Sequence, residues 1–404
     1  MQDKRILAKV ALLECDRYNL EDIEKKLREG LELLGGERFI RQLVPPGSSV
    51  FLKPNLMCSE PAGSHVITHY IIFEAVVRVL KDYTSHISFG DGHSFADSVR
   101  IAERAGLMEI AKRYGVSFDD LKDSLQVKIS DALLCHGLEV ARAPYEADVL
   151  ISLPKLKTHA LAFLTGAIKN QFGCIPGLQK SAWHARAKDP SHFNKMLLDL
   201  NTVMGTRFAI LDGITAMDGN GPKNGNPFPL HALIMGACIT AVDSVAARLI
   251  GYNNPLEVPV LRDAHQNCWG AVLEDEIQVL GSRIDILKAV GFKLARQENG
   301  LVNVAPSLLE RFIDSSLLRC ALRDTIVPNP VLIPEKCKGC RRCSDVCPQK
   351  PDVINFIKKR DSVLPHWNLN KCIRCFCCQE FCPEGAIEVR YSKLGKMINA
   401  IKRR

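Results

Sequence analysis

The 404-residue chain lacks the features that would place it in a membrane or a secretion pathway. It has no run of about 18 uninterrupted apolar residues, which is the length that a membrane-spanning helix needs. The N-terminal residues Met1 to Arg5 include charges, and the apolar run that follows is broken by Lys9, so no secretory signal is expected. We therefore expect a cytoplasmic protein without a membrane span.

Common nucleotide-binding motifs are also missing. There is no intact P-loop and no G-x-G-x-x-G, so the sequence has no flavin or NAD fingerprint. Aromatic residues make up only 6% of the chain and do not alternate with basic ones, and no nucleic-acid-binding module is found, so no nucleic-acid partner is expected. With 47% hydrophobic and 24% charged residues, the chain has the composition of an ordinary globular protein of two or three domains.

Cysteine, in contrast, is abundant. Of the 16 cysteines, nine lie between Cys337 and Cys382. In a long chain with no expected export signal, metal binding explains such a cluster better than disulfides do. Residues 337–404 also hold 15 of the 53 basic residues but only 6 of the 45 acidic ones. The net charge of +8 therefore belongs to the cysteine-rich region, and the rest of the chain is nearly neutral.

Eight of these cysteines form two runs with the same spacing, C-x2-C-x2-C-x3-C-P. The first run is Cys337, Cys340, Cys343 and Cys347, and the second is Cys372, Cys375, Cys378 and Cys382. Three thiolates at this spacing can surround one iron–sulfur cube, while the fourth, before the proline, reaches the other cube. Zinc is the alternative, but zinc ribbons need neither the third evenly spaced cysteine nor the terminal Cys-Pro.

The cysteine-rich region resembles the bacterial-type two-cluster ferredoxins. This resemblance implies two [4Fe-4S] clusters, one held by Cys337, Cys340, Cys343 and Cys382 and the other by Cys372, Cys375, Cys378 and Cys347. It also implies electron transfer with a redox partner such as a ferredoxin or a reductase. Basic residues among the ligands are expected to balance part of the negative charge of the clusters; they are Lys338, Arg341, Arg342, Lys371 and Arg374.

Two departures from the ferredoxin pattern stand out. The 24 residues between Cys347 and Cys372 exceed the length in compact members, and we expect a hairpin there. Cys377 lies between two expected ligands and is not assigned to a cluster.

The remainder of the chain alternates strand-like and helix-like segments, which predicts an α/β domain over residues 1–302. Continuous apolar runs such as Ser49–Lys53 and Val149–Leu153 indicate buried parallel strands. We expect a mostly parallel sheet with helices on both faces. It would be followed by a helical and Pro-rich connector (303–335), a small α+β ferredoxin-like domain (336–392) and a basic tail (393–404).

Four of the predicted strands end in a polar residue, namely Lys53, Asp91, Lys155 and Asp212. Ligands of open parallel sheets bind outside the carboxyl ends of the strands, so these residues are expected to converge on one crevice. Lysines there would attract a small anion such as a carboxylate or a phosphate. The candidate anion-binding residues are Lys53, Lys155, Lys157 and Lys169, and the candidate proton-transfer residues are His159, Asp91 and Asp212.

Each of these residues also has a structural explanation. Lysines at strand ends are often on the surface, and aspartates there often form turns. His159 would then be an ordinary hydrogen-bonded histidine. Asp243, at the expected start of a helix, is most simply an N-cap. A divalent metal held by Asp91, Asp212 and a histidine is a further alternative, without a tight ligand spacing to support it.

Several ordered motifs resemble the domain-of-unknown-function family 362, over roughly residues 6–290. They are Lys53-Pro54-Asn55, Pro154 to His159 (PKLKTH), Gly166 to Asn170 (GAIKN), Asp212-Gly213-Ile214, Gly219 to Pro222 (GNGP) and Val242 to Ala246 (VDSVA). Members of that family often carry a ferredoxin module at one end, but the resemblance implies no particular reaction.

These observations leave three classes of function. The leading expectation is an oxidoreductase that relays single electrons from the clusters to a small anionic substrate in the crevice. The second is a non-catalytic electron carrier or scaffold that docks a partner enzyme. The third is a transferase or ligase whose clusters are structural.

Overall fold

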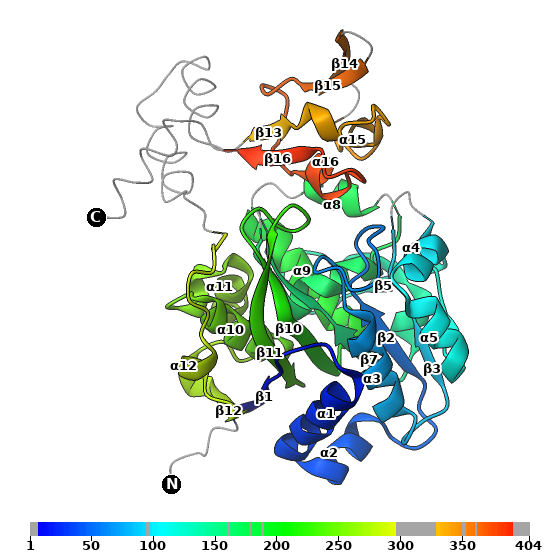
Figure 1. Ribbon diagram of the computed structural model, residues 1–404, viewed down its shortest axis with the longest axis vertical. Coiled ribbons are helices and arrows are strands. Elements are labelled where there is room, and N and C mark those ends of the chain that lie inside the picture. Colours follow the sequence, from blue (N-terminus) through cyan, green and yellow to red (C-terminus); the bar gives the residue numbers. More distant parts are fainter. Residues whose placement is uncertain are drawn as a thin grey trace. The chain divides into compact units, whose positions relative to one another are not determined.

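The computed structural model describes residues 7–93, 97–159, 162–177, 179–186, 190–295, 329–349, 353–359 and 362–390 (Figure 1). The chain divides into two compact units, one comprising residues 1–180 and 187–294 and the other residues 181–186 and 295–404. The helix expected in the connector and the expected basic tail both lie outside the described residues, so the boundaries proposed for them stay predictions.

The first unit is built on a ten-stranded sheet. Its main path has the order β12-β1-β11-β10-β7-β2-β3-β4, and β8 and β9 extend from β10. The strands are β1 (Ala8–Glu14), β2 (Val50–Pro54), β3 (Ile87–Phe89), β4 (Ser117–Phe118), β7 (Val149–Leu153), β8 (Lys155–His159), β9 (Phe163–Thr165), β10 (Phe208–Asp218), β11 (Asn226–Gly236) and β12 (Ile277–Gly281). A separate antiparallel pair is formed by β5 (Ser124–Lys128) and β6 (Gly137–Ala141).

The expected mostly parallel sheet is confirmed. Parallel pairing joins β12 to β1 and runs without interruption from β10 through β7, β2 and β3 to β4. Strand β11 is antiparallel to both of its neighbours, because a short connection makes β10 and β11 a hairpin.

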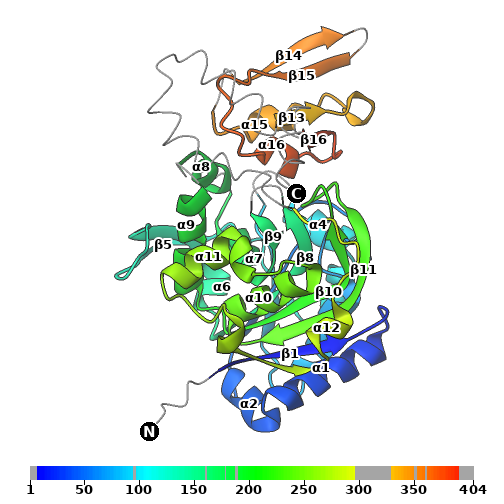
Figure 2. The ribbon, with the colours of Figure 1, turned by 90° about the vertical axis from the view of Figure 1, so that its left-hand side faces the viewer.

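Helices cover both faces of this sheet, as expected (Figure 2). Helices α1 and α3 lie on one face, and α7 and α10 lie on the other. The helices of the first unit are α1 (Leu20–Leu34), α2 (Gly36–Leu43), α3 (Tyr70–Leu80), α4 (Ser98–Arg104), α5 (Leu107–Tyr114), α6 (Arg142–Glu146), α7 (Ala167–Asn170), α9 (Pro190–Met204), α10 (Ile239–Ile250), α11 (Pro259–Gln266) and α12 (Ile284–Leu287). Most of helix α8 (Gln179–Arg186) belongs to the second unit.

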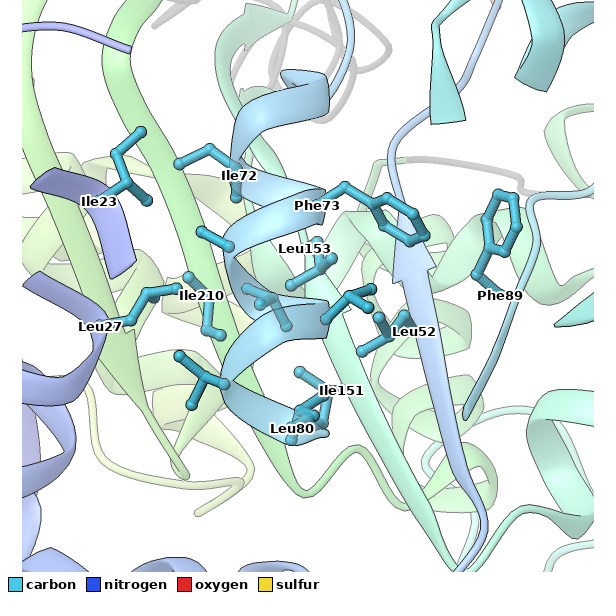
Figure 3. Close-up of a cluster of buried hydrophobic side chains, with 14 of the residues drawn as sticks. Ile23, Leu27, Leu52, Ile72, Phe73, Leu80, Phe89, Ile151, Leu153 and Ile210 are labelled. Carbon is cyan, nitrogen blue, oxygen red and sulfur yellow. The ribbon is translucent and has the colours of Figure 1, made fainter. Parts of the chain in front are cut away.

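Local sequence signals account for several of these elements. The Asn19 side chain accepts a hydrogen bond from the Asp22 amide and caps α1, whose buried stripe includes Ile23 and Leu27. Gly106 has φ +80°, which favours glycine, and it separates α4 from α5. Figure 3 shows the resulting core, where Ile72 and Phe73 of α3 face the strands.

The second unit consists of short elements that hold the cysteine runs. Strands β13 (Asn329–Leu332) and β16 (Ile387–Arg390) pair antiparallel, so part of the expected Pro-rich connector is a strand of this unit. The hairpin expected between the two runs is confirmed as β14 (Ile354–Lys359) and β15 (Ser362–Trp367). Each run contains a short helix, α15 (Arg342–Asp345) in the first and α16 (Cys377–Glu380) in the second. Within the described ranges, no helix is long and apolar enough to cross a membrane.

Candidate functional site

The first candidate pair lies at the carboxyl ends of β2 and β3. Lys53 Nζ is 2.7 Å from Asp91 Oδ1, and the two side chains are 0% and 5% exposed. The second carboxylate oxygen accepts a hydrogen bond of 2.7 Å from the Leu56 amide. Burial would raise the pKa of Asp91, but Lys53, followed by His93 and Lys180, outweighs it and holds that pKa below the usual value. Asp91 is therefore better suited to stay ionised than to donate a proton.

The second candidate pair joins β8 and β10, where Lys155 and Asp212 are register partners. Lys155 Nζ donates to Asp212 Oδ2 at 2.8 Å, and both side chains are fully buried. The phenol oxygen of Tyr18 accepts from Lys155 Nζ at 2.8 Å and donates to Asp212 Oδ1 at 2.8 Å. It also accepts from the Thr215 amide at 3.1 Å, which fills the hydrogen-bonding capacity of the hydroxyl.

Burial shifts the pKa values of Lys155 and Tyr18 in opposite directions. It lowers the pKa of Lys155 even though Asp212 works against the shift. It raises the pKa of Tyr18 well above its usual value, and Asp212 adds to that effect. The site therefore favours a neutral phenol held between the ammonium and the carboxylate.

Tyr18 and His69 belong to this site but carry no sequence motif. Their rings stack with centroids 3.6 Å apart and planes 5° from parallel. His69 caps α3, since its Nδ1 accepts from the Ile71 amide at 3.2 Å, and its own amide donates to Asp212 at 3.3 Å. Burial lowers the pKa of His69 to about 4, so the ring is neutral at neutral pH. No local signal in the sequence pointed to either residue.

Lys157 is connected to the backbone of Lys53, in the first pair, through two asparagine side chains. Its ammonium donates to Asn55 Oδ1 at 2.9 Å and to the Val66 carbonyl at 2.8 Å. Asn55 Nδ2 in turn donates to Asn170 Oδ1 at 3.3 Å, and Asn170 Nδ2 donates to the Lys53 carbonyl at 2.8 Å. Lys157 and Lys53 therefore belong to one buried polar network, and the Lys155–Asp212 pair with Tyr18 forms another.

His159 and Lys169 are also buried, at the end of β8 and in α7. His159 Nδ1 accepts a hydrogen bond of 3.1 Å from the Ala162 amide. Lys169 Nζ lies 5.8 Å from the centroid of the Phe172 ring, within cation–π range. Both side chains thus make contacts within their own segment of the chain.

The burial and the ion pairs of these residues bear on the alternative explanations given for them from the sequence. Lys53, Lys155 and Lys157 are not surface lysines, because each is 0% exposed. Asp212 lies within a strand and pairs with a lysine, so it is not a turn residue. Both candidate carboxylates are engaged by lysines, and no further His, Cys, Asp or Glu side chains in the described part of the chain join them in a site for a single metal ion.

The expectation that Asp243 is an N-cap of its own helix is wrong. Helix α10 begins at Ile239, four residues earlier, and Cys238 is its N-cap residue. Asp243 instead caps α7, accepting hydrogen bonds of 2.6 Å from the Ala167 amide and 3.0 Å from the Ile168 amide. Burial raises the pKa of Asp243 to about 7 in spite of these bonds. The close approach requires Gly166, where a Cβ would lie 2.1 Å from the carboxylate.

The cysteine runs come together in the second unit. One cavity there is lined by Cys337, Cys340 and Cys343 of the first run and by Cys382 of the second. Burial raises the pKa of the Cys343 thiol to about 12, and the nearby Cys382, Cys340 and Cys337 add to that shift. Four cysteines from both runs around one cavity are a donor set that fits an iron–sulfur cube.

The four cysteines expected to hold the second cluster differ in their burial. Burial raises the pKa of Cys378 well above its usual value, with Cys375 and Cys372 adding to the shift, so these three thiols lie near one another. Cys347 is half-buried and packs against the same hydrophobic cluster as Cys372 and Cys378. Cys377 is fully buried.

Comparisons with known proteins agree with this division of the chain. Residues 50–248 match the family described as "Domain of unknown function (DUF362)", and residues 329–383 match a "4Fe-4S dicluster domain". The chain is 32% identical over 253 residues to the thylakoid-associated protein sll1697 of Synechocystis sp., which covers 62% of this chain and 77% of that protein. It is 31% identical over 83 residues to the uncharacterized polyferredoxin-like protein MJ1302 of Methanocaldococcus jannaschii, covering 18% of this chain and 48% of that protein.

Solved structures also match part of the chain, among them the following two. One is a protein from Thermotoga maritima, with 12% identity and a TM-score of 0.35 over 53% of this chain and 55% of that one. The other is the lactate racemase apoprotein from Thermoanaerobacterium thermosaccharolyticum, with 14% identity and a TM-score of 0.35 over 54% of this chain and 52% of that one. The chain thus spans about half the length of each structure. From its sequence relatives, the chain belongs to the family described as domain of unknown function (DUF362), here joined to a 4Fe-4S dicluster domain.

Proposed function

We propose that this protein is an iron–sulfur oxidoreductase with two [4Fe-4S] clusters that delivers single electrons to a small anionic substrate at the carboxyl ends of the sheet strands. The observation that carries the proposal is the cavity lined by Cys337, Cys340, Cys343 and Cys382. When bound, such clusters supply one-electron transfer. Cys372, Cys375, Cys378 and Cys347 would hold the second cluster, and a ferredoxin or a reductase would be the redox partner.

The buried lysines of the first unit support the proposal that this unit binds an anionic substrate. The ammonium groups of Lys53, Lys155 and Lys157 lie near the strand ends, where open parallel sheets bind their ligands. Lys169 and His159 follow in the adjoining segments and are the candidates for contact with the substrate and for proton transfer. The anionic character of the substrate follows from the lysines, since a buried ammonium favours a negative partner.

A specific observation also favours a second function, that of a non-catalytic electron carrier. The ammonium groups of Lys53 and Lys155 are already paired with Asp91 and Asp212, so an anion would have to compete with an internal carboxylate. In that case the first unit would serve to dock a partner enzyme.

The experiment is anaerobic purification of the full chain with iron and sulfide analysis and low-temperature EPR. We expect about eight irons per chain, because each cube holds four. Cys382→Ser should remove roughly half of the iron, since it removes one ligand of the cavity. Cys377→Ser is the matched control, a buried cysteine in the same segment that should keep all of it. A colourless protein that holds zinc, or equal iron loss in both variants, would contradict the proposal.

The same preparation distinguishes the two functions. Mass spectrometry of small molecules released from the full chain should detect a bound anion that Lys169→Met loses. Reversible cluster reduction with no bound small molecule would favour the electron carrier instead.

A further inference from the structure

The two ligand loops of the second unit have the same backbone but different side chains. Left-handed residues occur at matching places between the cysteines of the two runs. Gly339 (φ +65°) corresponds to Arg374 (φ +55°), and Arg341 (φ +62°) corresponds to Phe376 (φ +59°). The second loop therefore carries an arginine where the first has no side chain.

This arginine is buried, whereas the arginine of the first loop is exposed. Arg374 is only 5% exposed, and Arg341 lies at the surface. Arg374 Nη1 donates to the Leu369 carbonyl at 2.5 Å and to the Cys372 carbonyl at 2.7 Å, and its Nε donates to Asn329 Oδ1 at 3.2 Å. These hydrogen bonds, one of them to the Cys372 carbonyl, hold the guanidinium beside the second run.

The surroundings of the second run explain why a fixed charge matters there. Each expected ligand set has two buried cysteines, but the other two cysteines of the second set are half-buried, whereas the first set includes the exposed Cys340. Phe376, within the second run, is also less than 10% exposed. Reduction of a cluster adds one negative charge, and burial away from water disfavours that charge. A guanidinium stays protonated even when buried, and its attraction for a negative charge is strong where water is excluded.

We propose that Arg374 raises the reduction potential of the [4Fe-4S] cluster bound by the second run, offsetting the burial of that cluster. This inference rests on the proposed function, because it requires the clusters to be present. With a higher reduction potential, the second cluster can be reduced by the same electron donor as the first cluster, so one electron can pass between the two clusters.

The test is an EPR-monitored redox titration of the full, cluster-loaded protein. Arg374→Gln should lower the equilibrium constant for one of the two reduction steps at least tenfold, which is 59 mV for one electron. The other step should change less than threefold. Arg374→Lys keeps the positive charge and should change either step less than threefold.

Arg390→Gln is the control, because it removes an exposed arginine of the same unit that lies outside both cysteine runs. It should change both steps less than threefold. The inference is overturned if Arg374→Gln keeps its iron and shifts neither step tenfold, or if Arg374→Lys or Arg390→Gln shifts a step as much. If Arg374→Gln holds less iron than the wild type, Arg374→Met replaces it and the same limits apply. A wild-type protein without iron would instead contradict the proposed function.

Discussion

The ammonium of Lys155 and the carboxylate of Asp212 lie 2.8 Å apart, and both side chains are completely buried. Their strands, β8 and β10, pair in parallel and bring the two residues into register. A buried ion pair costs free energy to desolvate, and this one regains part of it through Tyr18, which bonds to both partners. Breaking the pair should therefore affect stability strongly.

We expect Asp212→Asn to lower the free energy of unfolding by about 3–5 kcal/mol, because it leaves the Lys155 ammonium buried without its counter-charge. Combining it with Lys155→Met should restore part of the loss, since no buried charge then remains at the pair. Urea-induced unfolding measures these changes. The control is Asp285→Asn in the exposed Arg283–Asp285 pair, which should lower the free energy of unfolding far less, because water screens the charges. Equal losses at the two sites would contradict this account of the buried pair.

The second prediction concerns the close approach of Gly173 to the other ion pair. A Cβ at this position would lie 2.1 Å from Asp91 Oδ1 and 2.5 Å from Lys53 Nζ. Gly173→Ala should therefore force the pair apart and destabilise the protein by about 1–3 kcal/mol. Gly137→Ala is the control, because its nearest neighbour would be the Val127 carbonyl at 3.7 Å. Its free energy of unfolding should stay within about 0.5 kcal/mol of the wild type, and a similar loss in both variants would argue against the steric explanation.

The third prediction uses the raised pKa of Asp243, about 7 in the folded protein against 3.8 unfolded. Between these values the folded state binds more protons than the unfolded state, so the contribution of Asp243 to stability falls as pH rises. The wild type should lose stability relative to Asp243→Asn from pH 5 to 7, with a slope of up to about 1.4 kcal/mol per pH unit. Denaturant unfolding of both proteins across this range gives the difference. A difference that is independent of pH would show that Asp243 does not titrate there.

Local signals made much of the fold predictable. The Asn19 cap, the apolar stripe of α1 and the break at Gly106 each depend on residues within a few positions of one another. The convergence of Lys53 and Asp91 was predictable for a different reason, since the carboxyl ends of parallel strands meet at one edge of the sheet.

Contacts between distant segments were not predictable in this way. Tyr18 reaches Lys155 across 137 residues, and Asp243 caps a helix 75–76 residues before it. Nothing in the local sequence of either residue indicates its partner. The burial of the lysines was missed for the same reason, because a lysine is stable in the interior only where another segment supplies its hydrogen-bond partners.

The last prediction concerns His69, whose pKa shift has the opposite effect on stability from that of Asp243. Burial lowers the pKa of His69 from 6.5 to about 4, so between these values the unfolded state binds more protons. Its contribution to stability is complete above pH 6.5 and is lost as the pH falls toward 4. Protonation of Nδ1 would also remove the acceptor that caps α3 at the Ile71 amide.

His69→Asn is the informative variant, because asparagine is a good N-cap and does not titrate. The wild type should lose stability relative to this variant on acidification from pH 6.5 to 4.5, by up to about 1.4 kcal/mol per pH unit. Asp243→Asn, measured over the same range, should show a difference of the opposite sign. NMR titration of the His69 ring gives an independent measurement, and a midpoint near 6.5 would mean that the ring is not buried against Tyr18 as the structure has it.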